Sequence, residues 1–290
     1  RRVTIDLPDR KDRHEILTVH ARKKPLGPDV NLEVIAERTP GFSGAELYSL
    51  MNEGAILAAR ENRKEITQYD LIRSIEKVML GPERKSHLLS KKEKRLTAYH
   101  EAGHALVSSV LPNADPVHKI SIISRGRAGG YTLKLPFEDR RMHSRNSFKD
   151  DIAATLGGYV AEEMIYGDVT TGPSNDLAVL TALARDMVAR YGMSDTLGPV
   201  AFVNDRIEGG GKVSQEVAAK IDAEVSKIIA EARQRATQVL TDHRGALDSI
   251  AEKLVEVETV ERAEFEALLV ANGITPKKRE ENEQPVTITD

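Results

Sequence analysis

The sequence predicts a mainly α-helical protein made of two helical domains, the second with a small β-ribbon. Apolar residues recur at helical spacing along most of the chain. Residues 119–123 and 130–135 alternate in the manner of strands, and residues 3–7 indicate one further short strand. Glycine and proline interrupt the helical pattern at residues 80–85, which divides the chain in two. A length of 290 residues is enough for two hydrophobic cores.

Composition excludes several classes of function. The net charge is −3 with 30% charged residues, so nothing indicates a nucleic-acid partner. The chain has no cysteine, which excludes disulfides, thiolate metal ligands and a thiol nucleophile. No apolar run approaches the ~20 residues that span a bilayer, and we expect a soluble fragment.

The first region, residues 1–80, reads as a short strand followed by a helical module. Asp9 is placed to cap the first helix. Ser43 with Glu46, and Thr67 with Asp70, are spaced as capping boxes that open the two longer helices. We expect a linker at residues 81–89.

The second region is predicted to cover residues 90–275 and to end in a polar, disordered tail at residues 276–290. Its expected elements are helices joined by short loops, except for the β-ribbon. The expected helices cover residues 90–111, 144–166, 173–191, 214–241 and 244–257, with a last helix from Thr259.

The strongest chemical signal is His-Glu-x-x-His at residues 100–104. Residues four apart share one helix face, so His100 and His104 can hold one zinc ion through neutral imidazoles. Glu101 lies about 100° around the helix, where it can reach a water bound to the metal as a general base. A chance pair of histidines is the plain alternative, but the motif lies on the apolar face, where unpaired histidines are costly to bury.

A catalytic zinc needs a third protein ligand. The candidates are Asp176, Glu162, Glu163, Asp168, His118 and His143. Asp176 is favoured because it shares a helix face with apolar residues, where a carboxylate needs a partner. Glu162 could come close enough to orient an imidazole, although a solvated charge is the alternative. His118 and His143 are expected at the surface.

Two functions are possible for the predicted β-ribbon. It could simply cover the core, or its edge strand could hold a peptide substrate by adding it as a further strand. We favour substrate binding, with Gly129 and Gly130 leaving room for a second backbone.

Several segments resemble a known family. Residues 1–3, 7–9, 16–20 and 39–47 resemble the C-terminal part of an AAA+ ATPase module, and the closest resemblance is to the membrane-bound FtsH family of ATP-dependent zinc proteases. Residues 170–176 resemble the segment whose aspartate is that family's third zinc ligand, in agreement with Asp176. Glu162 matches a family glutamate near the histidines.

The resemblance carries expectations for a nucleotide. Arg1 takes an arginine-finger position, which completes the ATP site of a neighbouring subunit. Ile16, His20, Gly44 and Ala45 fall where the family's lid contacts the adenine and ribose. No Gly-x-x-x-x-Gly-Lys-Ser/Thr loop is present, so we expect that the fragment does not hydrolyse ATP alone.

The resemblance also implies the wider function. It implies the zinc endopeptidase part of a homo-hexameric, ATP-dependent protease that unfolds proteins and cleaves them in extended form. The parent protein would lie at the cytoplasmic face of the bacterial inner membrane, anchored by a segment outside this chain. The alternative is an AAA+ lid that serves assembly, with a structural or inactive metal site.

Overall fold

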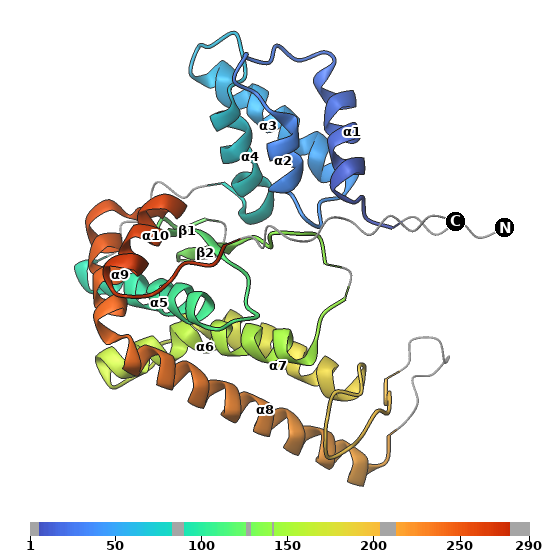
Figure 1. Ribbon diagram of the computed structural model, residues 1–290, viewed down its shortest axis with the longest axis vertical. Coiled ribbons are helices and arrows are strands. Elements are labelled where there is room, and N and C mark those ends of the chain that lie inside the picture. Colours follow the sequence, from blue (N-terminus) through green and yellow to red (C-terminus); the bar gives the residue numbers. More distant parts are fainter. Residues whose placement is uncertain (1–5, 83–89, 126–128, 141, 204–212, 279–290) are drawn as a thin grey trace, which may run out of the picture.

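The computed structural model describes residues 6–82, 90–125, 129–140, 142–203 and 213–278. These residues form an N-terminal domain of four helices and a larger C-terminal domain of six helices and a small sheet, as the mainly α-helical prediction required (Figure 1). Arg1 and most of the expected first strand lie outside the described residues, as do residues 83–89 of the expected linker.

The N-terminal domain packs four helices around its own core. They are α1 (Arg10–Ala21), α2 (Leu32–Glu37), α3 (Gly44–Arg60) and α4 (Gln68–Leu80). The capping boxes expected at Ser43 and Thr67 are both present, and Asp9 makes a third with Asp12. The core is formed by one face of each helix, with Leu17, Ile35, Leu47, Leu50, Met51 and Leu71 fully buried.

The C-terminal domain surrounds helix α5 (Lys91–Val110). Helix α5 packs against α6 (Arg145–Tyr166) and α9 (Arg244–Val257). Helices α7 (Ser174–Ala189) and α8 (Gln215–Asp242) pack on α6, with α8 running along the base of the domain (Figure 1). Helix α10 (Arg262–Ala271) is the last described helix, and it packs against the sheet and α9.

The sheet has three antiparallel strands in the order β2-β1-β3. They are β1 (Val117–Ser121), β2 (Tyr131–Lys134) and β3 (Thr259–Glu261). Sequence reasoning expected the first two strands, although β1 begins earlier than predicted. It missed β3, where a helix was expected from Thr259.

A tertiary contact explains the missed strand. Glu258 adopts a left-handed conformation (φ 61°) that ends α9, and the next residues pair with the central strand, Val260 opposite Ile120. Thr259 and Val260 are β-branched, and three residues are too few to show a period of two. Pairing with β1 therefore prevails over the helical pattern, and α10 begins only at Arg262.

Helices α5 and α6 cross at closest approach through two glycines. A Cβ atom on Gly103 would lie 2.3 Å from the carbonyl oxygen of Gly157, and one on Gly157 would lie 2.5 Å from that of Gly103. Gly103 and Gly157 thus form one contact, in which each glycine leaves room for the backbone of the other helix.

The first three residues of the expected disordered tail are ordered on the C-terminal domain. Lys277 donates hydrogen bonds from Nζ to the backbone carbonyls of Ser108 and Ala114 at the end of α5, so residues 276–278 lie on the C-terminal domain. Residues 279–290 lie outside the described part of the chain. No helix among the described residues is both long and apolar enough to cross a membrane.

Candidate metal centre

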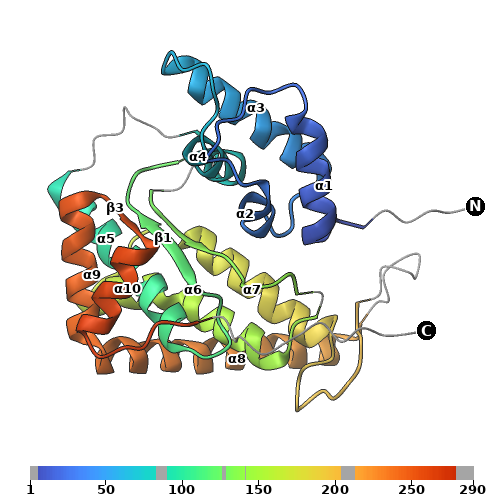
Figure 2. The same ribbon diagram turned by 45° about the horizontal axis from the view of Figure 1, so that its top comes forward.

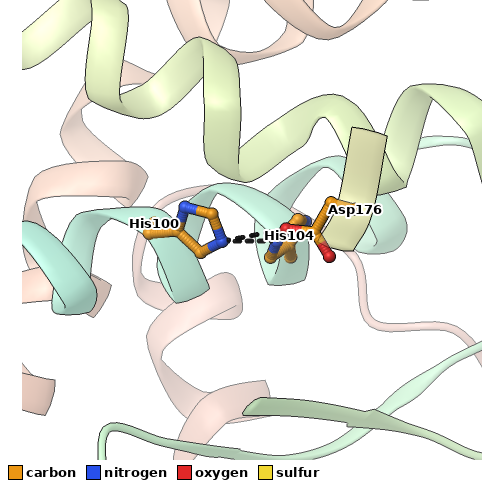
Figure 3. A group of neighbouring side chains, drawn as sticks. All are labelled: His100, His104 and Asp176. Atoms are coloured by element: carbon orange, nitrogen blue, oxygen red, sulfur yellow. Dashed lines mark hydrogen bonds and ion pairs between the residues drawn. The ribbon is translucent and has the colours of Figure 1, made fainter. Parts of the chain in front are cut away.

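Three side chains from two helices converge on one point. His100 and His104 project from α5, and Asp176 projects from the first turn of α7 (Figure 3). The Nε2 atoms of the two histidines are 3.0 Å apart, and Oδ2 of Asp176 lies 3.2 Å from the first and 3.4 Å from the second. The expected third ligand therefore lies with the two histidines.

These separations fit a tetrahedral zinc site. Zinc binds histidine nitrogen and carboxylate oxygen at roughly 2.0–2.2 Å, so two ligand atoms of a tetrahedron lie about 3.3–3.5 Å apart. The observed distances of 3.0 to 3.4 Å lie close to that spacing. Among the described residues, His100, His104 and Asp176 are the only such group of three or more His, Cys, Asp or Glu, which leaves a fourth position open.

The outer nitrogens of both rings point to acceptors. Nδ1 of His100 lies 2.9 Å from Oε1 of Glu162, and Nδ1 of His104 lies 2.9 Å from the backbone carbonyl of Ala154. A carboxylate can only accept, so a neutral His100 carries its proton on Nδ1 and turns the lone pair of Nε2 inward. Nδ1 of His104 lies 2.9 Å from the Ala154 carbonyl and 3.3 Å from the Gly158 backbone nitrogen, and the shorter contact, to the acceptor, favours the same tautomer. Three inward lone pairs within 3.4 Å repel one another unless a cation lies between them. The donor set thus fits a divalent metal.

Glu162 is held in place from both sides. Its side chain is 1% exposed, and its second oxygen accepts hydrogen bonds from the backbone nitrogen and hydroxyl of Thr170 at 3.0 and 2.9 Å. Burial raises the pKa of Glu162, but its hydrogen bonds to His100 and Thr170 outweigh this and hold the pKa below its usual range. The carboxylate remains charged and lies 2.9 Å from Nδ1 of His100.

The same arrangement shifts the pKa values of Asp176 and His100. Burial by itself raises the pKa of Asp176, but the adjacent imidazoles lower it well below its usual range. Burial lowers the pKa of His100, but its hydrogen bonds to Asp176 and Glu162 outweigh burial and raise the pKa to about 10. The site therefore favours positive charge at its centre.

Glu101 lies beside this group but does not belong to it. Its residue is 5% exposed, and Oε2 accepts a 2.8 Å hydrogen bond from the hydroxyl of Thr132 on β2. Burial raises the pKa of Glu101, while the two histidines and Thr132 lower it to a smaller extent. A buried carboxylate with a raised pKa is suited to take up a proton near neutral pH.

Two glycines make room for these side chains. A Cβ atom on Gly158 would lie 2.6 Å from Nε2 of both His100 and His104. A Cβ atom on Gly130 would lie 2.9 Å from Oε1 of Glu101. We expected Gly129 and Gly130 to leave room for a second backbone; at Gly130 the space is taken by Glu101 and the Ser121 carbonyl, whereas nothing lies within 4 Å of a Cβ on Gly129.

The remaining third-ligand candidates lie outside the cluster. Glu163 pairs with Arg233, and Asp168 is exposed and accepts a hydrogen bond from the Val169 backbone. His143 is exposed as expected and stacks on Phe148. His118 is instead half-buried on β1, where burial lowers its pKa to about 4.

The expected nucleotide contacts lie in the N-terminal domain. Ile16 and His20 are half-buried on α1, and Gly44 and Ala45 form the first turn of α3. The ring of His20 lies edge-on to Tyr48, one turn along α3, with centroids 5.1 Å apart. The four residues therefore come from two adjacent helices.

Sequence reasoning missed three supporting groups. The Ala154 carbonyl is a backbone atom and has no signature in the sequence. Thr170 and Thr132 are short polar residues whose roles depend on which carboxylate the fold places opposite them. A threonine inside a predicted edge strand near the motif was the one signal available.

The class of protein follows from this donor set. An open three-ligand site with a helical histidine pair and a buried carboxylate beside it is typical of metalloproteases. Residues 87–268 match the sequence family described as Peptidase family M41, and residues 29–72 match the AAA+ lid domain. The chain belongs to peptidase family M41, and it corresponds to the C-terminal part of an FtsH-type protein.

Individual relatives agree. The chain is 50% identical over 278 residues to "ATP-dependent zinc metalloprotease FtsH" of Thermotoga maritima, which covers 93% of this chain and 46% of the relative. It is 52% identical over 286 residues to FtsH 3 of Synechocystis sp., covering 94% and 46%. The chain thus spans less than half the length of these relatives.

Proposed function

We propose that this chain is the zinc-dependent endopeptidase part of an ATP-dependent protease. The observation that carries the proposal is the open three-ligand set of His100, His104 and Asp176, with buried Glu101 next to it. Metalloproteases of this motif place the glutamate as general base beside two ligands on one helix. The relatives, each named a zinc metalloprotease, support the same function.

Each residue has a distinct task. His100, His104 and Asp176 would hold zinc, which when bound supplies Lewis acidity toward water and a peptide carbonyl. Glu101 accepts a proton from the attacking water, and its raised pKa lets it keep that proton until the leaving amine takes it. Thr132 donates a hydrogen bond to Oε2 of Glu101 and so helps to hold the carboxylate in place.

Strand β2 supports binding of an extended substrate. Among the described strands it pairs only with β1, so its other edge is open to a further strand. Its residue Thr132 contacts Glu101, so a peptide paired with this edge would lie beside the base. An extended protein segment is therefore the proposed substrate.

A structural or inactive metal site in an assembly module is the competing function. A structural zinc usually has four protein ligands, whereas three donors gather here among the described residues. Metal content measured together with casein turnover separates the two: a stoichiometric metal without turnover would support the structural site.

The wider machine is also a proposal. The names of the relatives support dependence on ATP, with Ile16, His20, Gly44 and Ala45 as nucleotide contacts and Arg1 as an arginine finger toward a neighbour. Such a finger is useful only in a closed ring, so we propose a homo-hexamer at the cytoplasmic face of a bacterial inner membrane. Sedimentation equilibrium of the parent with a non-hydrolysable nucleotide tests it, and a monomer that still degrades folded substrates with ATP would refute the ring.

Substitution of Glu101 tests the chemistry directly. Glu101→Gln retains the three ligands and the shape of the side chain but cannot accept a proton. We expect unchanged zinc stoichiometry and loss of casein cleavage to below about 1% of wild type, since loss of general-base catalysis typically costs 10²–10⁴-fold. Retained cleavage would remove Glu101 from the mechanism.

A further inference from the structure

The N-terminal domain holds strand β2 near both of its ends. At the start of the strand, Oη of Tyr131 donates a 3.1 Å hydrogen bond to Oε2 of Glu76 on α4. Beyond its last residue, Lys134, the chain reaches Asp139, which pairs with Arg13 on α1. Figure 2 shows the N-terminal domain, which includes α1 and α4, lying along one side of the C-terminal domain.

Glu76 forms the first attachment. It is 3% exposed, and it accepts hydrogen bonds from three side chains of the C-terminal domain: Nζ of Lys119 at 2.7 Å, Nη2 of Arg125 at 3.0 Å and Oη of Tyr131. A buried carboxylate has no water to replace a lost partner, so this contact is costly to break. Glu76 thus joins α4 to both β1 and β2.

Arg13 forms the second attachment. It is 1% exposed, and its own domain fixes it through hydrogen bonds to the backbone carbonyls of Ala36 and Pro8. The guanidinium then meets both oxygens of Asp139, at 2.7 and 3.1 Å. Such a two-point pair fixes direction as well as distance.

The strand between these attachments is the one that faces the base. Thr132 immediately follows Tyr131 and donates to Oε2 of Glu101, and Gly130 immediately precedes it and packs against the same carboxylate. Strand β2 is one of the two edge strands of the sheet, and no described strand pairs with its outer edge. A shift of the Tyr131 hydroxyl would therefore move both the contact to Glu101 and the substrate edge.

We propose that the N-terminal domain positions β2 through these two attachments, Glu76–Tyr131 and Arg13–Asp139, which we name the β2 clasp. Glu76 and Arg13 are then positioning residues for peptide cleavage, because they set where Thr132 meets Glu101 and where the substrate edge lies. This part of the inference rests on the proposed endopeptidase function. The placement of β2 by the clasp does not depend on the endopeptidase function.

The chain offers a matched test. Glu76→Gln keeps the size of the side chain but removes its charge. Glu53→Gln makes the same change in an ion pair with Lys77 that lies within the N-terminal domain. The readouts are amide hydrogen exchange at residues 131–134, zinc stoichiometry, and kcat and KM for an unstructured peptide, all on this 290-residue chain.

We expect Glu76→Gln to speed exchange in β2 at least ten-fold and to lower kcat/KM about ten-fold, with zinc stoichiometry unchanged. Glu53→Gln should stay within two-fold of wild type in all three. Should Glu76→Gln fail to fold, Tyr131→Phe and Asp139→Asn each release one attachment with little change of shape. Each should then speed exchange in β2 about three-fold.

Exchange and cleavage separate failure of the clasp from failure of the proposed function. Exchange in β2 that matches wild type in Glu76→Gln, or in Tyr131→Phe and Asp139→Asn if the first is unfolded, would overturn the clasp whatever the activity. Faster exchange in a chain whose wild type binds zinc but cleaves nothing would support the clasp and refute the endopeptidase. Faster exchange with unchanged kcat and KM would show that β2 is held but that its placement does not serve cleavage, which overturns the role of positioning residues.

Discussion

The two domains differ in how far apart in sequence their essential contacts lie. In the N-terminal domain, the capping boxes join residues three apart, such as Ser43 and Glu46. In the C-terminal domain, His100 contacts Glu162 and Asp176, which are 62 and 76 residues away. The comparison teaches that the first domain is specified by local signals, whereas the site in the second exists only once distant helices are packed.

The glycines of the two domains show the same difference. Gly54 in the N-terminal domain faces the end of the Leu71 side chain, which can move. Gly103 in the C-terminal domain faces the backbone of another helix, which cannot move without carrying the site with it. Substitutions at equivalent positions in the two domains should therefore differ in size.

The largest expected effect is loss of the distant ligand. We expect Asp176→Ala to lower zinc affinity more than 100-fold, because a metal–ligand bond is lost. Glu162→Ala removes only a group that orients His100 and should cost about 10–100-fold. Chelator competition on both variants measures this, with Asp70→Asn in the N-terminal domain as a control that leaves affinity unchanged. If Glu162→Ala released the metal and Asp176→Ala did not, the ligand assignment would be wrong.

The glycine pair gives the next largest effect. We expect Gly103→Ala to destabilise the chain by about 2 kcal/mol or more, because its methyl group would lie 2.3 Å from the Gly157 carbonyl. Gly54→Ala should change stability by less than about 1 kcal/mol, since the gain in helix propensity offsets a small movement of Leu71. Urea unfolding followed by circular dichroism measures both. Equal effects would contradict the difference between the domains.

Acid should act on the N-terminal domain through Asp70. Burial raises the pKa of this fully buried carboxyl, but hydrogen bonds from Arg63 and Thr67 lower it to about 2. A depressed folded-state pKa gives stability that is present above the unfolded value of about 4 and lost as pH falls toward 2. The loss should reach about 2–3 kcal/mol.

The matched variant isolates that contribution. Asp70→Asn should be less stable than wild type at pH 6, and the gap should close between pH 4 and pH 2. Hydrogen exchange of α3 and α4 as a function of pH follows the N-terminal domain separately. A gap that stayed constant with pH would show that the Asp70 charge contributes nothing.

Much of the fold could be predicted because its signals are local. The helix starts at Ser43, Thr67 and Ser90 follow from hydrogen bonds between neighbouring residues. His100 and His104 lie together because an α-helix repeats every 3.6 residues, whatever surrounds it. The inward placement of Asp176 followed from the apolar face of its own helix.

The rest could not be predicted because it depends on what the fold brings opposite. Strand β3 exists only because β1 is there to pair with it. The Ala154 carbonyl and the Thr170 hydroxyl act on His104 and Glu162 only after α5, α6 and the start of α7 have met. Gly130 looked like space for a substrate, and only the packed structure shows the Glu101 side chain there.

The pairing of β1 with β3 has a consequence for synthesis on the ribosome. The hydroxyls of Ser121 and Thr259 are hydrogen-bonded across 138 residues of sequence. At about 5–20 residues per second, roughly 7–28 seconds separate the emergence of these two strands. The N-terminal domain can complete its core during that delay. Helix α5, which carries the two histidines, stays partly exposed until α9 has been synthesised and can pack against it. The nascent chain is therefore most exposed to aggregation and to premature metal capture in this interval.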